Sequence, residues 1–303
     1  MKKLLQCTVL IACAGPLYVH AAENDTWHYN IGAMYEIENV EGQADDKDGL
    51  YEPSVYFNAS YGAWTISMTM YQEGSADYSN FTRGTYFNRP ELDIRYQIID
   101  NDAWSLGFTG GMRNYGYHFK NDDGSNNGTA NTQRYKFQPD WNVNINNDWS
   151  FSGWLAYFRF DNDLDQTGYS DSRVETETGF SWKINETVSV RANYYLERGF
   201  NTDSDKNNGE FSTQEIRAYV PISLGNTTLT PYTRLGLDRW TNWDWSDDID
   251  REDHDYNRLG LLYAYDFQNG LSMTLEYAYE WENHDEGGND KFHYAGIGVN
   301  YGF

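Results

Sequence analysis

The chain has 303 residues, with 46 acidic and 22 basic side chains, a formal net charge of −24 and a mean hydropathy of −0.79. A helical membrane protein is excluded, because a transmembrane helix needs about 18 or more consecutive apolar residues and no run beyond the N-terminus approaches that length. A chain this acidic is also a poor partner for nucleic acid. Aromatic residues make up 17% of the chain, which suits a membrane interface or an all-β surface.

The N-terminus has the layout of a secretory signal. Lys2 and Lys3 precede an apolar stretch that runs to Leu17, and small residues near Ala21 and Ala22 fit a cleavage site. We therefore expect residues 1–21 to be a signal peptide and residues 22–303 to form a single domain. Loss of the two lysines would change the formal net charge from −24 to −26.

Both cysteines lie inside this leader. Cys13 ends a loose lipoprotein cleavage box, but the apolar stretch continues past it to the second cleavage site, so we favour removal of the whole leader. The mature chain would then contain no thiol, which excludes disulfides and cysteine-based metal or catalytic sites. We predict no metal and no cofactor.

From residue 27 to the C-terminus, hydropathy alternates with a period of two, which predicts β-strands of about ten residues. The pattern is clearest in residues 27–37, 106–112, 188–196, 271–281 and 292–303. Short turns are expected at 61–62, 100–102, 146–148, 185–186, 225–226 and 268–270, and long polar connections near 39–50, 74–84, 120–131, 161–171, 201–210, 242–255 and 283–291. Short and long connections alternate, which predicts about fourteen antiparallel strands with short periplasmic turns and long extracellular loops.

Aromatic residues mark the ends of these strands. Trp64, Trp104, Trp149 and Trp182 lie near short turns, as in the aromatic girdle of a membrane barrel, and the chain ends on Phe303. In hydrocarbon every backbone polar group must be paired, so such strands have to close. The sequence therefore predicts an all-β, transmembrane antiparallel β-barrel in the bacterial outer membrane.

The opposite face of the strands is charged, with both signs present. A soluble β-sandwich also alternates, but the apolar face here is rich in Tyr and Trp and the connections alternate in length. In a fourteen-stranded barrel the charged face surrounds a lumen too wide for side chains to fill. We predict that the pore is lined by Glu36, Glu38, Glu52, Glu73, Arg89, Glu91, Asp93, Arg95, Arg113, Arg134, Lys136, Asp140, Arg173, Glu175, Glu177, Arg191, Glu215, Arg217, Arg234, Asp238, Arg258, Glu276 and Glu280.

Two histidines are expected to face each other across neighbouring strands. Outward residues must pair with outward residues, so the turn at 268–270 must be a three-residue connection that closes Phe267 on Leu271. This register sets Arg258 opposite Glu280. Further up, it sets His254 opposite His284. Two imidazolium ions about 6 Å apart repel by roughly 1–3 kcal/mol.

The pairing suggests a pH sensor beside an acidic segment at 242–255. Its carboxylates are Asp244, Asp247, Asp248, Asp250, Glu252, Asp253 and Asp255. In mild acid the repelling histidines would release this segment to fold over the mouth of the pore. Neighbouring acids would stabilise the charged histidines and offset the repulsion, so two solvated rim histidines without a switching role are the alternative interpretation.

Four stretches of the chain resemble the porin G family of outer-membrane porins: residues 30–40, 173–179, 208–219 and 290–296. The resemblance covers the whole chain and implies a fourteen-stranded barrel that acts as a monomer. It also implies a nonselective pore for ions, sugars and other small solutes that is open near neutrality and blocked in acid by the sixth extracellular loop. His254 and His284 match the histidines of the family's sensor, whereas Asn283 and residues 122–129 depart from its pattern.

Other functions are less well supported. An omptin-like outer-membrane protease would use loop Asp and His residues such as Asp253, His254 and Asp255, but those enzymes spend the same chain length on fewer, taller strands. A barrel phospholipase would need polar partners for His293, and none stand out. The fragment at 46–49 lacks the bidentate Glu of a calcium loop. We expect a channel whose partners are outer-membrane lipids and small hydrophilic solutes.

Overall fold

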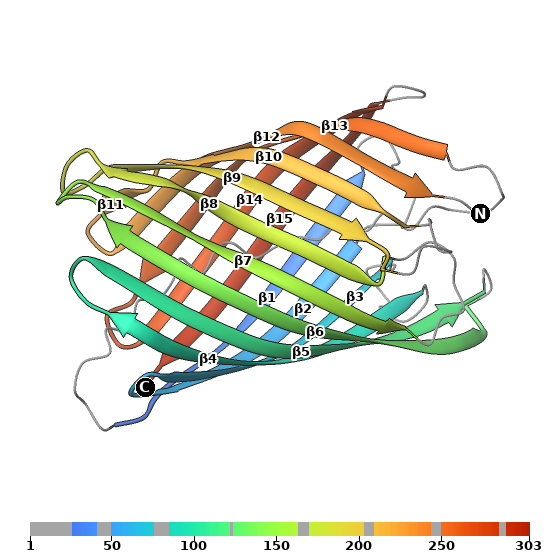
Figure 1. Cartoon of the computed structure of the whole chain (residues 1–303), viewed down its shortest axis with the longest axis horizontal. Coiled ribbons are helices and arrows are strands. Elements are labelled where there is room, and N and C mark those ends of the chain that lie inside the picture. Colours follow the sequence, from blue (N-terminus) through green and yellow to red (C-terminus); the bar gives the residue numbers. More distant parts are fainter. Residues whose placement is uncertain are drawn as a thin grey trace.

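The chain folds into a single closed sheet of antiparallel strands (Figure 1). The computed structural model describes residues 26–40, 50–75, 85–121, 124–162, 170–202, 209–243, 250–284 and 289–303. The strands are β1 (His28–Val40), β2 (Leu50–Tyr61), β3 (Trp64–Ser75), β4 (Tyr86–Asp100), β5 (Trp104–Lys120), β6 (Asn126–Asn144), β7 (Trp149–Asn162), β8 (Ser172–Lys183), β9 (Ser189–Phe200), β10 (Phe211–Tyr219), β11 (Ile222–Leu224), β12 (Thr227–Trp243), β13 (Asp250–Asp266), β14 (Leu271–His284) and β15 (Asn289–Gly302). Within these residues no helix is long and apolar enough to cross a membrane.

The barrel has fourteen strands, as predicted, because β10 and β11 are two parts of one strand. Both pair with β12, and they are separated by Val220 and Pro221. Pro221 has no backbone N–H to donate, so the ladder is interrupted there. Its carbonyl still accepts a hydrogen bond from Ser189 N–H at 3.1 Å. Pairing of β1 with β15 joins the two ends of the chain, and pairing of β10 with β12 completes the ring.

Short and long connections alternate as predicted, and the short turns share one end of the barrel, at the left of Figure 1. Three of the short turns share one side-chain motif. The Asn101 side-chain oxygen accepts hydrogen bonds from the N–H groups of Ala103 and Trp104, both at 3.0 Å. Asn146 and Asn185 repeat this arrangement. The asparagines satisfy turn N–H groups that have no ladder partner, which fixes the tight reversal.

The turn at 268–270 has the predicted three residues. Phe267 N–H donates to the Leu271 carbonyl at 2.9 Å, and Gln268 and Gly270 take positive φ angles of 64° and 84°. The β13–β14 register that follows sets Arg258 opposite Glu280, which confirms the predicted register of this hairpin.

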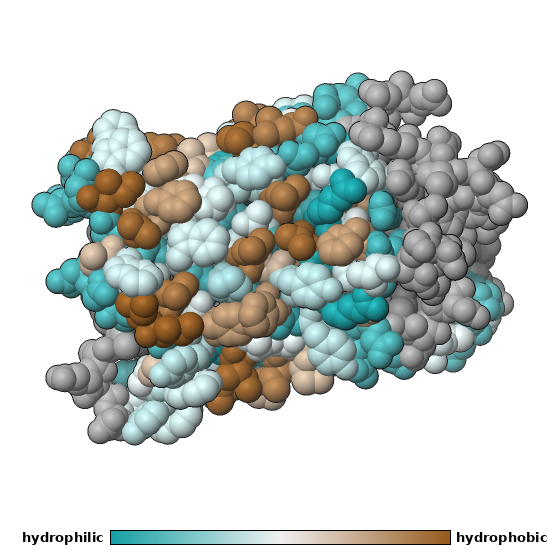
Figure 2. All heavy atoms as spheres, in the orientation of Figure 1, coloured by the Kyte–Doolittle hydropathy of each residue, from teal (hydrophilic) through white to brown (hydrophobic). Residues whose placement is uncertain are grey.

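The outer face is apolar and the inner face is polar. Exposed large apolar residues alternate with buried charged ones along the strands, and Figure 2 shows brown and white side chains covering the barrel wall between more hydrophilic rims. The tryptophans near the short turns are all exposed, and Trp149 stacks on Trp182 with ring centroids 5.5 Å apart. This is the aromatic girdle predicted from the sequence.

The strands are longer than the ten residues predicted. The longest, β6, has 19 residues, and β12 and β13 have 17 each. The connections are correspondingly shorter: β6 begins at Asn126, inside the predicted loop at 120–131, and the predicted loop at 242–255 is reduced to residues 244–249. Hydrogen bonding between strand backbones does not require apolar side chains. The strands therefore continue beyond the membrane into polar segments that the sequence pattern assigned to loops.

Candidate channel interior

The positions predicted to line the pore lie, with one exception, on the inner face. They alternate with exposed apolar residues of the same strands, as Arg95 does between Ile94 and Tyr96. Many are buried, because neighbouring side chains pack along the barrel wall; the buried members are Glu36, Glu38, Glu52, Glu73, Arg134, Glu175, Glu177, Glu215, Arg217, Arg234, Arg258, Glu276 and Glu280. The interior is therefore a polar wall with charges of both signs.

Asp238 is the exception, and its assignment to the pore is corrected here. The β10–β12 register pairs Gln214 with Asp238 but Glu215 with Gly236, so a β-bulge in β12 shifts the alternation by one residue. Glu215 faces inward, which places its neighbour Gln214 on the outer face. The Gln214 side-chain amide donates to Asp238 Oδ2 at 3.0 Å, so Asp238 lies on the outer face too.

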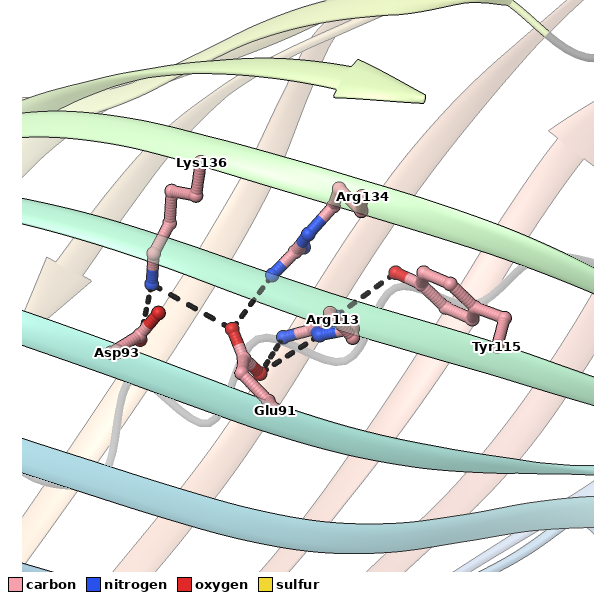
Figure 3. A network of polar contacts seen from close by, with 6 residues as sticks. All are labelled: Glu91, Asp93, Arg113, Tyr115, Arg134 and Lys136. Carbon is pink, nitrogen blue, oxygen red and sulfur yellow. Dashed lines mark hydrogen bonds and ion pairs between the residues drawn. The ribbon is translucent and has the colours of Figure 1, made fainter. Parts of the chain in front are cut away.

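An ion-pair network joins β4, β5 and β6 (Figure 3). Glu91 on β4 is its centre: it accepts a hydrogen bond from Arg113 Nε at 2.8 Å and one from Arg134 at 2.7 Å. Lys136 lies 3.6 Å from Glu91 and also pairs with Asp93. Nearer the short turns, Arg95 makes two hydrogen bonds to the Asp140 carboxylate, at 2.6 and 3.0 Å. Each carboxylate of this wall is therefore met by at least one cation.

A second network crosses β8, β9 and β10. Arg217 pairs with Glu177 at 2.8 Å and with Glu215 at 2.7 Å, and its guanidinium lies 3.4 Å from the ring centroid of Tyr195. The Tyr195 hydroxyl donates to Glu175 and Glu197, at 3.0 and 2.9 Å. These contacts hold the charged side chains against the wall, which leaves few of them free to reorient.

Strands β1–β3 contribute acids without bases. Glu36 and Glu52 are opposite each other in the register, and neither strand carries Lys or Arg among its described residues. Tyrosines supply the contacts instead: Tyr294 donates to Glu36, and Tyr71 donates to Glu73 at 3.5 Å. One carboxylate oxygen each of Glu36 and Glu52 has no hydrogen-bond partner.

Sequence reasoning missed the uncharged and some charged members of this interior. The buried tyrosines Tyr71, Tyr195, Tyr256 and Tyr294 lie on the inner face, where arginines stack on them. These tyrosines occupy the same alternate strand positions as the inward charged residues, and this pattern could have identified them from the sequence. Glu282 is also buried, and it pairs with Arg239 at 2.7 Å. Arg239 follows the bulge of β12, so simple alternation from the start of that strand could not have placed it.

The two histidines lie opposite each other where the ladder between β13 and β14 ends. The backbone register pairs His254 with His284, and their side chains are outside the described part of the structure. Of the acidic segment, Asp250, Glu252, Asp253 and Asp255 belong to β13, where only the Asp255 side chain is described and is exposed. Asp244, Asp247 and Asp248 lie outside the described residues, as do the predicted signal peptide and the fragment at 46–49.

A closed barrel with an apolar outer wall and a charged inner wall defines a transmembrane β-barrel channel. A sequence profile of the family described as Outer membrane protein G (OmpG) matches residues 24–301. The chain is 63% identical to Outer membrane porin G of Escherichia coli (strain K12) over 303 residues, all of both chains. The chain therefore belongs to the OmpG family of porins: it is a channel of the bacterial outer membrane and not an enzyme.

Solved structures of other barrels share the fold. The CymD monoaromatic hydrocarbon channel matches with a TM-score of 0.57 and 9% identity, covering 93% of this chain and 90% of that one. The toluene transporter TbuX of Ralstonia pickettii matches with a TM-score of 0.53 and 10% identity at the same coverage. At sequence identities this low, the similarity shows a shared fold alone.

Proposed function

We propose that this channel lets ions, sugars, oligosaccharides and other small hydrophilic solutes diffuse passively as a monomer, with little selectivity. The interior supports this proposal because it carries charges of both signs, and most of its cations are already held by carboxylates of the same wall. A wall of paired charges offers polar contact to many solutes and strong attraction to few. We further propose that residues 1–21 are a cleaved signal, which the mass of the mature protein would test.

We propose that the channel closes in acid, with His254 and His284 as the sensor and residues 242–255 as the gate. The backbone pairing of the two histidines carries this proposal. Unperturbed imidazoles titrate near pH 6.5, so both would be cationic in mild acid and would repel by roughly 1–3 kcal/mol at about 6 Å. The β12–β13 ladder is irregular between Leu235 and Trp240, next to this point, so the strand ends above it have fewer backbone contacts to resist separation.

Several other charged groups surround the sensor. Asp253 and Asp255 flank His254, and Glu282 lies two residues before His284 on β14. Glu282 is committed to Arg239 on β12, at 2.7 Å, which reduces its attraction for a protonated histidine. The remaining acids stabilise the charged histidines and offset the repulsion between them, so they oppose the switch.

Single-channel current in a planar bilayer tests the proposal directly. The wild type should conduct at neutral pH and close in mild acid, and His254→Ala with His284→Ala should stay open at both. A matched control is His118→Ala with His293→Ala, since both of these histidines lie on the outer face, stacked with Tyr86 and hydrogen-bonded to Tyr277 respectively. Wild-type current that does not change with pH would leave an ungated porin. Closure that survives in the double mutant would leave a gated porin and contradict the histidine sensor.

A further inference from the structure

The outer face of the barrel has an uneven distribution of cations. Among the described residues, Lys120, Arg159, Arg198 and Lys291 are the basic side chains that alternate with inward residues and so point outward. All four lie toward the end of the barrel that carries the long connections. At the other end, Lys183 borders a short turn and pairs with Glu186 of that turn at 2.8 Å.

Arg159 and Arg198 lie at the upper edge of the apolar band. On β7, ten residues separate Arg159 from Trp149, which belongs to the girdle at the short-turn end. Ten tilted strand residues rise about 25 Å along a barrel axis, which matches the height of the apolar band of an outer-membrane barrel. On β9, Arg198 lies ten residues beyond Val188 and reaches a similar height. Both guanidinium groups therefore lie at the level of the outer-leaflet headgroups.

The two arginines differ in how their charge is met. Arg159 pairs with Asp171 at 3.0 Å and donates to Thr202 at 2.8 Å. Arg198 is exposed and makes no ion pair or hydrogen bond within the described part of the chain. Among the described residues, therefore, no acid pairs with the charge that Arg198 presents at the headgroup level.

Arg198 is nevertheless held in place. Its guanidinium lies 4.7 Å from the ring centroid of Trp240, and that indole is buried, with 7% of its surface exposed. The register places Ser212 beside both residues on the outer face, so the three side chains come from adjacent strands β9, β10 and β12. Stacking on a fixed aromatic ring leaves the edges of the guanidinium free to donate two parallel hydrogen bonds, the geometry that suits a phosphate.

We propose that Arg198, supported by Trp240, binds a phosphate group of a phosphorylated lipid in the outer leaflet of the membrane. Charge complementarity selects this occupant, because Arg198 lies at headgroup height with no ion-pair partner among the described residues. The exposed carboxylate nearby on the same face, Asp238, accepts a hydrogen bond from the Gln214 amide at 3.0 Å. The site lies on the outside of the barrel wall, and the inference does not depend on gating or on the solutes that pass through the lumen.

Native mass spectrometry of the folded full-length barrel in detergent would test this assignment. The probes are bis-phosphorylated lipid A and the same lipid after removal of its phosphates. We expect the wild type to bind the phosphorylated form about fivefold more tightly, the preference provided by one basic residue at an anionic headgroup. Arg198→Gln should abolish that preference, and Arg198→Lys should keep part of it. Arg159→Gln is the matched control and should change it little, because Arg159 is already neutralised by Asp171.

Three outcomes would overturn the proposal. These are an unchanged preference in Arg198→Gln, an equal loss in Arg198→Gln and Arg159→Gln, and displacement of the lipid by inorganic phosphate. The second would indicate a diffuse basic surface, and the third a site for free anions. Heat-dependent mobility on a gel verifies that each variant is folded, and Arg198 is exposed enough for its replacement to leave the barrel intact.

Discussion

Strands β1–β3 and strands β4–β6 form neighbouring parts of the interior wall, yet they hold their carboxylates in opposite ways. On β4–β6, Glu91 is surrounded by three cations, and on β1–β3, Glu36 faces Glu52 and receives a tyrosine hydroxyl. The first wall is a set of mutual ion pairs in which each charge needs the others. The second is an acidic surface on which one buried carboxylate oxygen each of Glu36 and Glu52 has no hydrogen-bond partner. We therefore expect the first wall to stabilise the barrel and the second to set its electrostatic preference.

The largest effect on stability should come from the centre of the paired wall. Replacing Glu91 by Gln leaves Arg113 and Arg134, which are 14% and 7% exposed, without their counter-charge. Removing one partner of a buried ion pair costs about 3–5 kcal/mol, and we expect the lower end because Arg113 keeps the Tyr115 hydroxyl at 3.0 Å. Urea unfolding of the barrel in lipid vesicles measures the change. A loss below about 1 kcal/mol would show that the network contributes little to stability.

The Arg95 and Asp140 pair should show an intermediate effect. It is bidentate but about a third exposed, 32% and 27%, so water screens it more than the Glu91 network. We expect a coupling free energy of about 1 kcal/mol from a double-mutant cycle with Arg95→Gln and Asp140→Asn. Zero coupling in the same urea assay would mean that this ion pair is only a geometric contact.

On the acidic wall formed by β1–β3, removal of carboxylates should not lower the free energy of unfolding. Glu36→Gln with Glu52→Gln removes two facing charges, and the Gln side-chain oxygen at 36 can still accept the Tyr294 hydroxyl. We expect the free energy of unfolding to stay the same or to rise by up to about 1 kcal/mol, because like charges no longer oppose each other. The reversal potential in a potassium chloride gradient should shift toward anion permeation.

A surface carboxylate provides the control for this shift. Glu186, 91% exposed in a short turn, should change the reversal potential little when replaced by Gln. An equal shift from Glu186→Gln would mean that charge at the mouth, and not the acidic wall, sets the preference. Destabilisation by the double replacement on β1–β3 would remove the contrast between the two walls.

Much of this architecture could be predicted from the sequence, because the alternation of apolar and polar residues indicates both which face of the wall a side chain lies on and how neighbouring strands are paired. The parity of Phe267 and Leu271 fixed the length of the turn between them, and that turn fixed the register up to the histidines. Inward charges followed from the same rule. The ends of the strands could not be predicted in this way, because above the membrane both faces meet water and the alternation disappears.

The bulges account for the remaining differences. On β4, Gln97 pairs with Gly107 but Ile99 pairs with Leu106, so Ile98 is an extra residue. If Ile98 were paired in the ladder and not bulged, the register from the short turn would set Glu91 opposite Asn114 and not Arg113, and the central ion pair would be lost. The bulge on β12 likewise moved Asp238 to the outer face. Neither bulge interrupts the alternation of apolar and polar residues, so the alternation alone could not reveal them.

The smallest effect is expected from the partly exposed ion pair of Asp171, between β7 and β8, with Arg159. Partial burial would raise the pKa of this carboxyl, but hydrogen bonds from Thr202, at 3.0 and 2.7 Å, together with Ser172 and Arg159, lower it below its usual range. A depressed folded-state pKa stabilises the fold above the unfolded pKa of about 3.9, and that contribution is lost as the pH falls through the lower folded value.

Asp171→Asn should therefore lower the free energy of unfolding at neutral pH by less than about 1 kcal/mol, because the pair is exposed to water and screened by salt. As the pH falls through the lowered folded pKa, the difference between the variant and the wild type should disappear, since the wild-type carboxyl becomes protonated there. Asp161→Asn, which replaces an exposed acid near the same end of the barrel, is the matched control and should change the free energy of unfolding little. If the two aspartates instead behave alike, the Thr202 contacts add nothing, and the contrast between ion pairs in the barrel wall and ion pairs in water becomes sharper.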